Sequence, residues 1–375
     1  MKIWVISRGY PTPENNMWGS FELEQAKLLA RKGHDVCYIA LMLRFFSYRN
    51  PSGYRFFEED NVKIFTYSHL YFPVRFGIYW ESYEDKCWQM LFNEAEAAGG
   101  LPDIIHVHYP TMISSINIIE KYRQKGVKIF ATEHWSKVHL QSLKKHNLTR
   151  LQYYTSHSNC FITVSKSLQD SIRKMTEVSV PMEVVPNMFS PVFQPVPKKD
   201  MEKFTFVVSG HMVALKRFDV VVKTFLEKFE GQEKVHLKLI GDGPEKTKLV
   251  RLSKNSPQIE FTGSVKGDIV AKEVSQSDVL ICISTHETFA VPIIEAWACG
   301  IPVITLEQIP ASGYCDDTRG IVLNDSMLPQ LGEAMEKIYA QYSQYNKEEI
   351  AEFAKSTFGD EAIYNQLINI YKIYS

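Results

Sequence analysis

Short apolar runs alternate with helical segments along almost the whole chain, and this alternation restricts the fold more than any other feature. The runs are apolar on both faces, which is typical of a parallel sheet covered by helices on both sides. We therefore expect an α/β fold built from doubly wound parallel sheets. The predicted strands are 2–7, 35–40, 103–108, 127–132 and 159–164, then 204–209, 235–240, 259–263, 278–284 and 302–305.

The alternation is interrupted once, at residues 186–203, which contain four prolines. Proline continues neither a helix interior nor a sheet ladder, so this segment is predicted to be a linker. A chain of 375 residues also suits two domains better than one. We place the first domain at 1–188 and the second at 189–357, followed by a terminal helix at 358–375. Ligands of such sheets bind at the carboxyl ends of the strands, so two facing edges would form a cleft.

Bulk composition excludes several classes of protein. The net charge of -1 gives no indication of nucleic-acid binding, and the six cysteines form no C-x-x-C pair. No apolar run reaches the roughly 18–20 residues that a membrane span needs. We therefore expect a cytoplasmic protein. One region, from Lys121 to Arg150, has eight basic residues and one acid, Glu133. It is either a solvated helix face or a surface for phosphate or for the inner face of an anionic membrane.

Residues 44–92 fit the alternation poorly because they are dense in aromatic side chains. One interpretation is a long insertion that packs its aromatics on the first domain. The other is a surface that contacts an acceptor or a membrane. The aromatic residues are Phe45, Phe46, Tyr48, Tyr54, Phe56, Phe57, Tyr67, Tyr71, Phe72, Phe76, Tyr79, Trp80, Tyr83 and Trp88.

Two glycine-containing loops follow strands of the second domain. Gly210 comes directly after the strand 204–209, and Lys216 stands six residues later at the expected start of a helix. Glycine permits close approach of a ligand, while a helix start and a lysine both attract a diphosphate. The same pattern also occurs as an ordinary strand–helix turn. The second loop contains Gly241 and Gly243 and is followed by Pro244, the expected first residue of a helix. It lacks the third glycine of a dinucleotide fingerprint. It is either a nucleotide-facing loop or a tight turn.

The most informative stretch is 282–305, with the sequence CISTHETFAVPIIEAWACGIPVIT. Glu287 stands in the loop after a buried strand, and Glu295 lies one turn inside the following helix. The backbone N–H groups of Phe289, Ala290 and Val291 lie at the start of that helix. Carboxylates accept hydrogen bonds from hydroxyls and N–H groups donate to phosphate, and a sugar nucleotide requires both. Glu295 could simply be an acid that the helix dipole favours in the first turn. An acid on an otherwise apolar helix needs a partner, however, which favours a functional role.

These motifs resemble the retaining glycosyltransferases of family 4. The resemblance rests on HETFAVPIIEAWACGIPVI, on the GDGP loop and on the Gly-x5-Lys turn, and it is specific over 204–305. More loosely, SRGYPTPENNMWGSFELEQAKLLARKGHDV resembles the family's opening strand, glycine loop and helix, and VVPNMFSPVFQP resembles its interdomain segment. The resemblance implies two Rossmann-like domains facing across a cleft, the GT-B fold, with a terminal helix that returns to the first domain.

The resemblance also implies roles for individual residues. Glu287 would face the donor sugar, Glu295 would hold the ribose hydroxyls, and Lys216 would neutralise the diphosphate. In the first domain, His134 would lie near the reacting centre, and Gly19 would let the first helix approach the donor phosphates. The alternative for His134 is a loop histidine whose hydrogen bonds are satisfied within the protein. The implied catalytic residues are thus Glu287, His134 and Lys216. The implied donor-binding residues are Gly19, Gly210, His211, Lys216, Gly241, Gly243, Phe289, Ala290, Val291 and Glu295.

The chain departs from the family pattern at three positions: His211 replaces an arginine, and Ala290 and Met188 replace glycines. No Asp-x-Asp motif follows a strand, and the nearest carboxylate pair is Asp316–Asp317 in a late loop. We therefore expect no metal and no cofactor besides the nucleotide-sugar donor. The expected reaction is retaining transfer to a saccharide or lipid-linked saccharide in cell-surface polysaccharide assembly. A sugar-nucleotide epimerase of this fold, a non-catalytic nucleotide-binding module and a nicotinamide-dependent dehydrogenase remain as alternatives.

Overall fold

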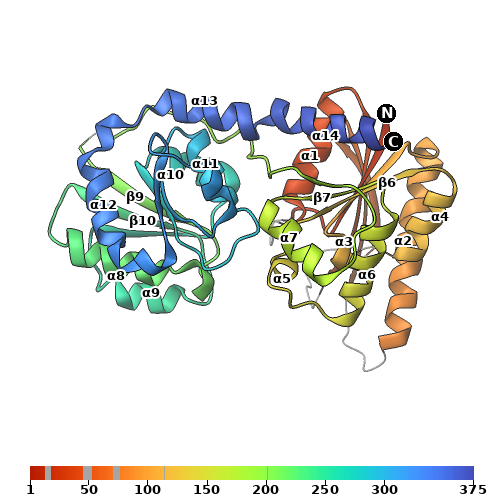
Figure 1. Cartoon of the computed structure of the whole chain (residues 1–375), viewed down its shortest axis with the longest axis horizontal. Coiled ribbons are helices and arrows are strands. Elements are labelled where there is room, and N and C mark those ends of the chain that lie inside the picture. Colours follow the sequence, from red (N-terminus) through yellow and green to blue (C-terminus); the bar gives the residue numbers. More distant parts are fainter. Residues whose placement is uncertain (13–17, 45–52, 71–76, 114, 201) are drawn as a thin grey trace. The chain divides into compact units, whose positions relative to one another are not determined.

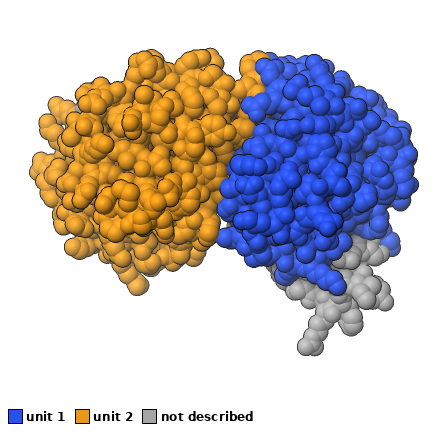
Figure 2. All heavy atoms as spheres, in the orientation of Figure 1, with its two compact units in different colours: residues 1–185, 364–375 blue, residues 186–363 orange. Residues whose placement is uncertain are grey.

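The computed structural model describes residues 1–12, 18–44, 53–70, 77–113, 115–200 and 202–375. The chain divides into two compact units, one formed by residues 1–185 with 364–375 and the other by residues 186–363 (Figure 2). The division thus falls three residues before the boundary expected after residue 188. The last helix changes units after residue 363, whereas the expected second boundary followed residue 357.

The first unit has an eight-stranded sheet in the order β3-β4-β2-β1-β5-β6-β7-β8. All neighbouring strands are parallel except β3 and β4, which form an antiparallel pair. The chain starts in the middle at β1, builds outward through β2, and then returns to the other side of β1 at β5. The strands are β1 (Lys2–Ser7), β2 (Asp35–Arg44), β3 (Gly53–Glu59), β4 (Val62–Leu70), β5 (Ile104–His108), β6 (Lys128–Glu133), β7 (Cys160–Thr163) and β8 (Met182–Val184).

Helices cover this sheet (Figure 1). The last helix of the chain belongs to this unit from Tyr364 onward, where the side chain of Tyr371 is fully buried. The helices are α1 (Ser20–Arg31), α2 (Gly77–Gly99), α3 (Pro110–Ile113), α4 (Ile116–Gln124), α5 (Ser136–His139), α6 (Lys145–His157), α7 (Lys166–Met175) and α14 (Asp360–Tyr374).

Much of the segment 44–92, which fits the alternation poorly in sequence, belongs to the α/β scheme in the structure. β4 extends the parallel sheet beyond β2, and α2 packs on both strands. Trp88 of α2 is buried, and its ring centroid lies 6.2 Å from that of Phe92. Tyr54 and Phe56 of β3 are instead 38% and 48% exposed. Outside the described residues, or with side chains outside them, lie Phe45, Phe46, Tyr48, Tyr71, Phe72, Phe76, Tyr79 and Trp80.

The second unit has a six-stranded parallel sheet in the order β11-β10-β9-β12-β13-β14. The chain again starts in the middle, so the strand order reverses between β9 and β12. The strands are β9 (Phe204–Ser209), β10 (Val235–Ile240), β11 (Ile259–Gly263), β12 (Val279–Cys282), β13 (Val303–Leu306) and β14 (Gly320–Leu323). The α-helices are α8 (Phe218–Phe229), α9 (Lys246–Leu252), α10 (Gly267–Ser275), α11 (Val291–Ala298), α12 (Leu331–Ala340) and α13 (Lys347–Phe358).

Two helices begin later than expected. Lys216 ends a short 3-10 turn, Ala214–Lys216, and α8 starts at Phe218. The intervening Arg217 has φ 52, a left-handed conformation that interrupts the helix. Likewise α9 starts at Lys246, two residues after Pro244. Among the helices in the described part of the chain, none is both long and apolar enough to cross a membrane.

Candidate functional site

The predicted residues of the second unit lie at the point where its strand order reverses. Gly210 follows β9, Glu287 follows β12, and these two strands are neighbours in the sheet. Ligands of doubly wound sheets bind outside the carboxyl ends of the strands at such a point, because the helices that follow the two strands diverge there. The topology therefore places these loops where a nucleotide would bind.

The loops after β9 and β10 pack against each other through glycine. A Cβ atom on Gly241 would overlap the carbonyl oxygen of Gly210, and one on Gly243 would lie 2.5 Å from the carbonyl oxygen of Met212. The backbone N–H of Met212 donates to the carbonyl of Asp242 at 2.9 Å. Gly241 and Gly243 are thus required for contact between two loops, whatever ligand they also approach.

Lys216 and Glu287 form an ion pair between the loops after β9 and β12. The loops are also joined by a hydrogen bond of 2.9 Å from the backbone N–H of Thr285 to the carbonyl of Leu215. The side chains of Lys216 and Glu287 are 23% and 15% exposed, so both are shielded yet reachable. Burial disfavours the charge on Lys216, but the carboxylates of Glu287 and Glu295 outweigh it and raise the pKa of Lys216. Lys216 is therefore a firmly protonated cation.

Glu295 lies one turn inside α11 and is half-buried. Burial raises the pKa of Glu295 to about 7, and the nearby charge of Lys216 only partly offsets this effect. Within the described part of the chain its carboxylate forms no hydrogen bond. A half-buried carboxyl group without a hydrogen-bond donor is suited to a ligand that brings donors of its own, such as hydroxyl groups.

Backbone N–H groups at the start of α11 lie in the same loop as Glu287. No hydrogen bond between described residues uses the N–H groups of Phe289, Ala290 or Val291 as donors. The Phe289 side chain is 1% exposed, and its ring packs against those of Tyr314 and Phe358, which fixes the loop. Ala290 caps the helix with φ 79, a conformation that favours glycine. Although Ala290 replaces the glycine that is usual in the family, the backbone at this position keeps the left-handed conformation.

His211 and Gly19 complete the predicted donor-binding set. His211 is exposed in the loop after β9, close enough to Asp242 to interact with its charge. Gly19 caps α1 in the first unit with φ 76, and a Cβ atom there would overlap the carbonyl of Gly9 and lie 2.5 Å from the Tyr38 hydroxyl oxygen. The packing of the first loop therefore requires glycine at this position.

His134, the predicted catalytic residue of the first unit, follows β6 and is held by its neighbours. Its Nε2 atom lies 3.0 Å from Nδ1 of His108, and its ring stacks on Tyr109 with centroids 4.9 Å apart. The buried carboxylate of Glu133 accepts hydrogen bonds from the backbone N–H groups of His134 and Trp135, at 2.9 and 2.8 Å. These contacts fix both the backbone and the ring of His134.

Two histidines next to His134 in this network were not predicted from the sequence. His106 and His108 alternate along β5, and their rings stack with centroids 4.4 Å apart. His106 is hydrogen-bonded to the Tyr371 hydroxyl and to Thr132, both at 2.6 Å, which connects α14 to the network. Burial lowers the pKa of His106 to about 3 and that of His108 well below its ordinary value. The sequence signal that could have predicted them is the His-x-His spacing within a strand, which places both rings on one face of the sheet.

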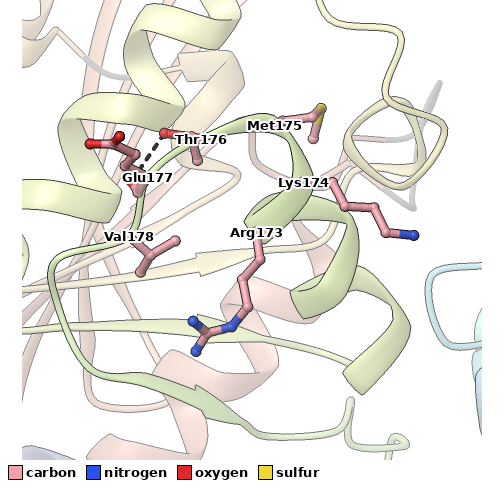
Figure 3. A pocket seen from close by; sticks show the side chains of 6 residues that line it. All are labelled: Arg173, Lys174, Met175, Thr176, Glu177 and Val178. Atoms are coloured by element: carbon pink, nitrogen blue, oxygen red, sulfur yellow. Dashed lines mark hydrogen bonds between the residues drawn. The ribbon is translucent and has the colours of Figure 1, made fainter.

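A hollow of about 400 Å³ at the end of α7 is lined by Arg173, Lys174, Met175, Thr176, Glu177 and Val178 (Figure 3). It contains no predicted site residue. Among the residues that the structure describes, no group of three or more His, Cys, Asp or Glu side chains could hold a metal ion.

Comparison with known proteins follows the same division of the chain. The family described as "Glycosyltransferase Family 4" matches residues 22–191, and that described as "Glycosyl transferases group 1" matches residues 203–341. The N-acetyl-alpha-D-glucosaminyl L-malate synthase of Bacillus anthracis is 26% identical over 91% of this chain and 93% of its own length.

Solved structures show the same fold at lower identity. The sucrose-phosphate synthase of Thermosynechococcus elongatus has a TM-score of 0.76 at 18% identity, covering 100% of this chain and 98% of the other. The HepE protein of Anabaena, solved with UDP and glucose, has a TM-score of 0.70 at 13% identity, covering 99% of both chains.

Proposed function

Because this chain belongs to the glycosyltransferases of family 4 and has their GT-B fold, we propose that it transfers a sugar with retention of the anomeric configuration. Glycosyl transfer from a nucleotide sugar is the class of activity that the relatives and the family models support. The configuration of the product, the acceptor and the pathway are the proposed parts. Because the relatives are glycosyltransferases, neither the epimerase nor the non-catalytic module is favoured.

The observation that best supports this proposal is the ion pair between Lys216 and Glu287 beside the half-buried Glu295. Lys216 supplies positive charge for the diphosphate, and the N–H groups of Phe289–Val291 supply donors for its oxygens. Glu287 faces the transferred sugar, where a carboxylate stabilises the positive charge that develops on the anomeric carbon. Glu295 accepts hydrogen bonds from the ribose hydroxyls.

We further propose that the reaction needs no divalent metal. Lys216 and the start of α11 provide the positive potential that a metal ion would otherwise supply at the leaving diphosphate. His134, fixed by His108 and Glu133, supports the reacting centre from the first unit.

For the acceptor, we propose a saccharide or lipid-linked saccharide used in cell-surface polysaccharide assembly. An acceptor anchored in a membrane agrees with a peripheral contact of the first unit with anionic lipid, on the cytoplasmic side. The basic residues between Lys121 and Arg150 are not equally available for this contact. Arg123 and Lys125 pair with Glu120 and Glu96, whereas Lys144 and Lys145 are exposed at the start of α6 and form no ion pair with another described residue.

The test is the release of nucleoside diphosphate from UDP-, GDP- and ADP-sugars, measured with and without acceptors. A thermal-shift screen with the same donors identifies the nucleotide, since a bound ligand raises the melting temperature by mass action. NMR of the product gives its anomeric configuration. The proposal is supported if release of nucleoside diphosphate depends on the acceptor and if a donor with an axial anomeric bond gives a product with an axial anomeric bond. Interconversion of the donor sugar without an acceptor would identify an epimerase instead.

A further inference from the structure

Arg8 occupies the position in the first unit that corresponds to the nucleotide loops in the second. It directly follows β1, and Tyr109 directly follows β5, the neighbouring strand on the other side of the strand-order reversal. Ligands of doubly wound sheets bind at this point. The two side chains therefore lie where the first unit would hold a ligand of its own.

The guanidinium group of Arg8 is held in a fixed orientation. Its Cζ atom lies 4.1 Å from the centre of the Tyr109 ring, and its Nε atom lies 3.6 Å from Oε1 of Glu22. Tyr109 adopts φ 51, a left-handed conformation that is strained for a bulky residue. The same ring stacks on His134. One strained aromatic residue thus contacts both Arg8 and the histidine expected at the reacting centre.

The charge of Arg8 is incompletely balanced. Glu22 is 1% exposed, and its Oε2 atom is buried without a hydrogen-bond partner among the described residues. Burial raises the pKa of Glu22, and the charge of Arg8 counteracts this only in part. In the described part of the chain, no hydrogen bond uses a guanidinium nitrogen of Arg8. By contrast, Arg123 donates two hydrogen bonds to Glu120.

A guanidinium with an aromatic ring on its face and free N–H groups at its edge is suited to bidentate binding of a carboxylate or phosphate. We propose that Arg8 binds an anionic group of the acceptor, either a carboxylate or a phosphate, next to His134. This inference rests on the proposed glycosyl transfer. The diphosphate of the donor has the same chemistry, but Lys216 and the start of α11 already provide for it in the second unit.

The test compares a neutral with an anionic acceptor in two pairs of related structure: glucose with glucuronate, and myo-inositol with myo-inositol 1-phosphate. We expect wild-type kcat/KM to favour the anionic member of at least one pair by 10-fold or more. Arg8→Gln should remove this preference and leave kcat/KM for the neutral member of the pair unchanged. Arg8→Lys, which keeps the charge but loses the fork geometry, should retain part of it. Arg173→Gln removes a positive charge from the same unit and should behave as wild type.

A second readout needs no transfer activity. The arginine reagent phenylglyoxal should modify Arg8 in the wild-type protein, since its side chain is 28% exposed. Mass spectrometry should show that methyl phosphate or glucuronate protects Arg8 but not Arg173, and that UDP protects it no better than methyl phosphate does. This measurement also covers the case in which Arg8→Gln fails to fold.

Three results would overturn the inference. Equal use of neutral and anionic acceptors by the wild type is one. Loss of UDP or GDP affinity in Arg8→Gln, or preferential protection of Arg8 by UDP, is the second and would assign Arg8 to the donor. Failure of every anion to protect Arg8 is the third. If no sugar nucleotide supports transfer at all, the proposed function fails instead, and the protection measurement still decides whether Arg8 binds anions.

Discussion

The ammonium group of Lys216 is paired with the carboxylate of Glu287, although the two residues lie 71 positions apart. Each follows a different strand, and the pair lies at the reversal of strand order in the second unit. A cation held in place before the donor binds loses little entropy when it contacts the diphosphate, so it is preorganised to stabilise the leaving group.

This arrangement predicts that transfer is independent of divalent metal. Dialysis against EDTA should leave the rate of nucleoside diphosphate release unchanged, and added Mg²⁺ or Mn²⁺ should raise it less than twofold. Lys216→Met, which removes the charge but keeps much of the side-chain length, should slow release by roughly 10²-fold or more. Loss of activity in EDTA that Mg²⁺ or Mn²⁺ restores would refute metal independence.

Glu295 should make stability depend on pH. The pKa of Glu295 is raised from 4.5 to about 7. Between these values the folded protein holds a proton that the unfolded chain has released, so stability falls as pH rises through this window. The change is on the order of 3 kcal/mol at most, since one pKa unit corresponds to about 1.4 kcal/mol.

Urea unfolding of the wild type and of Glu295→Gln between pH 4.5 and 8 checks this prediction. The variant resembles the protonated acid at all pH values, so its advantage over the wild type should grow with pH and level off above about pH 7. Parallel pH profiles for the two proteins would contradict a raised pKa at this position.

His134 should act on turnover more than on nucleotide binding. His134→Ala should lower kcat by roughly 10²-fold, the lower end of the range for loss of one positioned polar group, with little change in the affinity for nucleoside diphosphate. The matched control is His157→Ala, because His157 is exposed on α6. A wild-type rate in His134→Ala would exclude this histidine from the reacting centre.

The membrane contact should depend on exposed lysines. Each basic residue near an anionic surface contributes about 1 kcal/mol. Replacing Lys144 and Lys145 by Glu should therefore weaken binding to vesicles that contain phosphatidylglycerol, and salt should weaken wild-type binding in the same way. The control is a variant in which Lys254 and Lys266, which are exposed in the second unit, are replaced by Glu. Equal binding to neutral vesicles, or none to either kind, would disprove the contact.

The sequence was most informative where one local pattern determines both backbone and chemistry. Most strands and the loops around Glu287 and Gly241 follow from apolar runs that end in glycine or polar residues. The strands β3, β4, β8 and β14 were missed. The first two lie among dense aromatics, and the last two are short, with Val322 of β14 exposed.

The first-unit network was missed for a different reason. Arg8 and Tyr109 are about a hundred residues apart, and their contact exists only because β1 and β5 are neighbours in the sheet. The order of strands is a long-range property, and no local pattern specifies it. The same holds for the bond between His106 and Tyr371, which depends on where the last helix packs.

Substitutions of the two glutamates should have different effects: one on the rate of transfer and the other on nucleotide affinity. Glu287 is expected to contact the transferred sugar, and its effect should strengthen as positive charge develops on the anomeric carbon. An interaction made mainly in the transition state raises turnover more than binding. Glu287→Gln should therefore slow transfer by roughly 10²–10³-fold, the scale of losing one electrostatic stabiliser, while nucleoside diphosphate still binds.

Glu295 is expected to hold the ribose, which donor and nucleoside diphosphate share. Glu295→Ala should therefore weaken both ligands equally, by about 1.5–3 kcal/mol, the value of hydrogen bonds to a charged group. Calorimetry with UDP, GDP and ADP, beside single-turnover rates, separates the two effects. Glu260→Gln is the control, since that side chain is 62% exposed in the same unit. If Glu287→Gln loses nucleotide binding and Glu295→Ala keeps it, the roles are reversed, and if neither quantity changes in either variant, the site lies elsewhere.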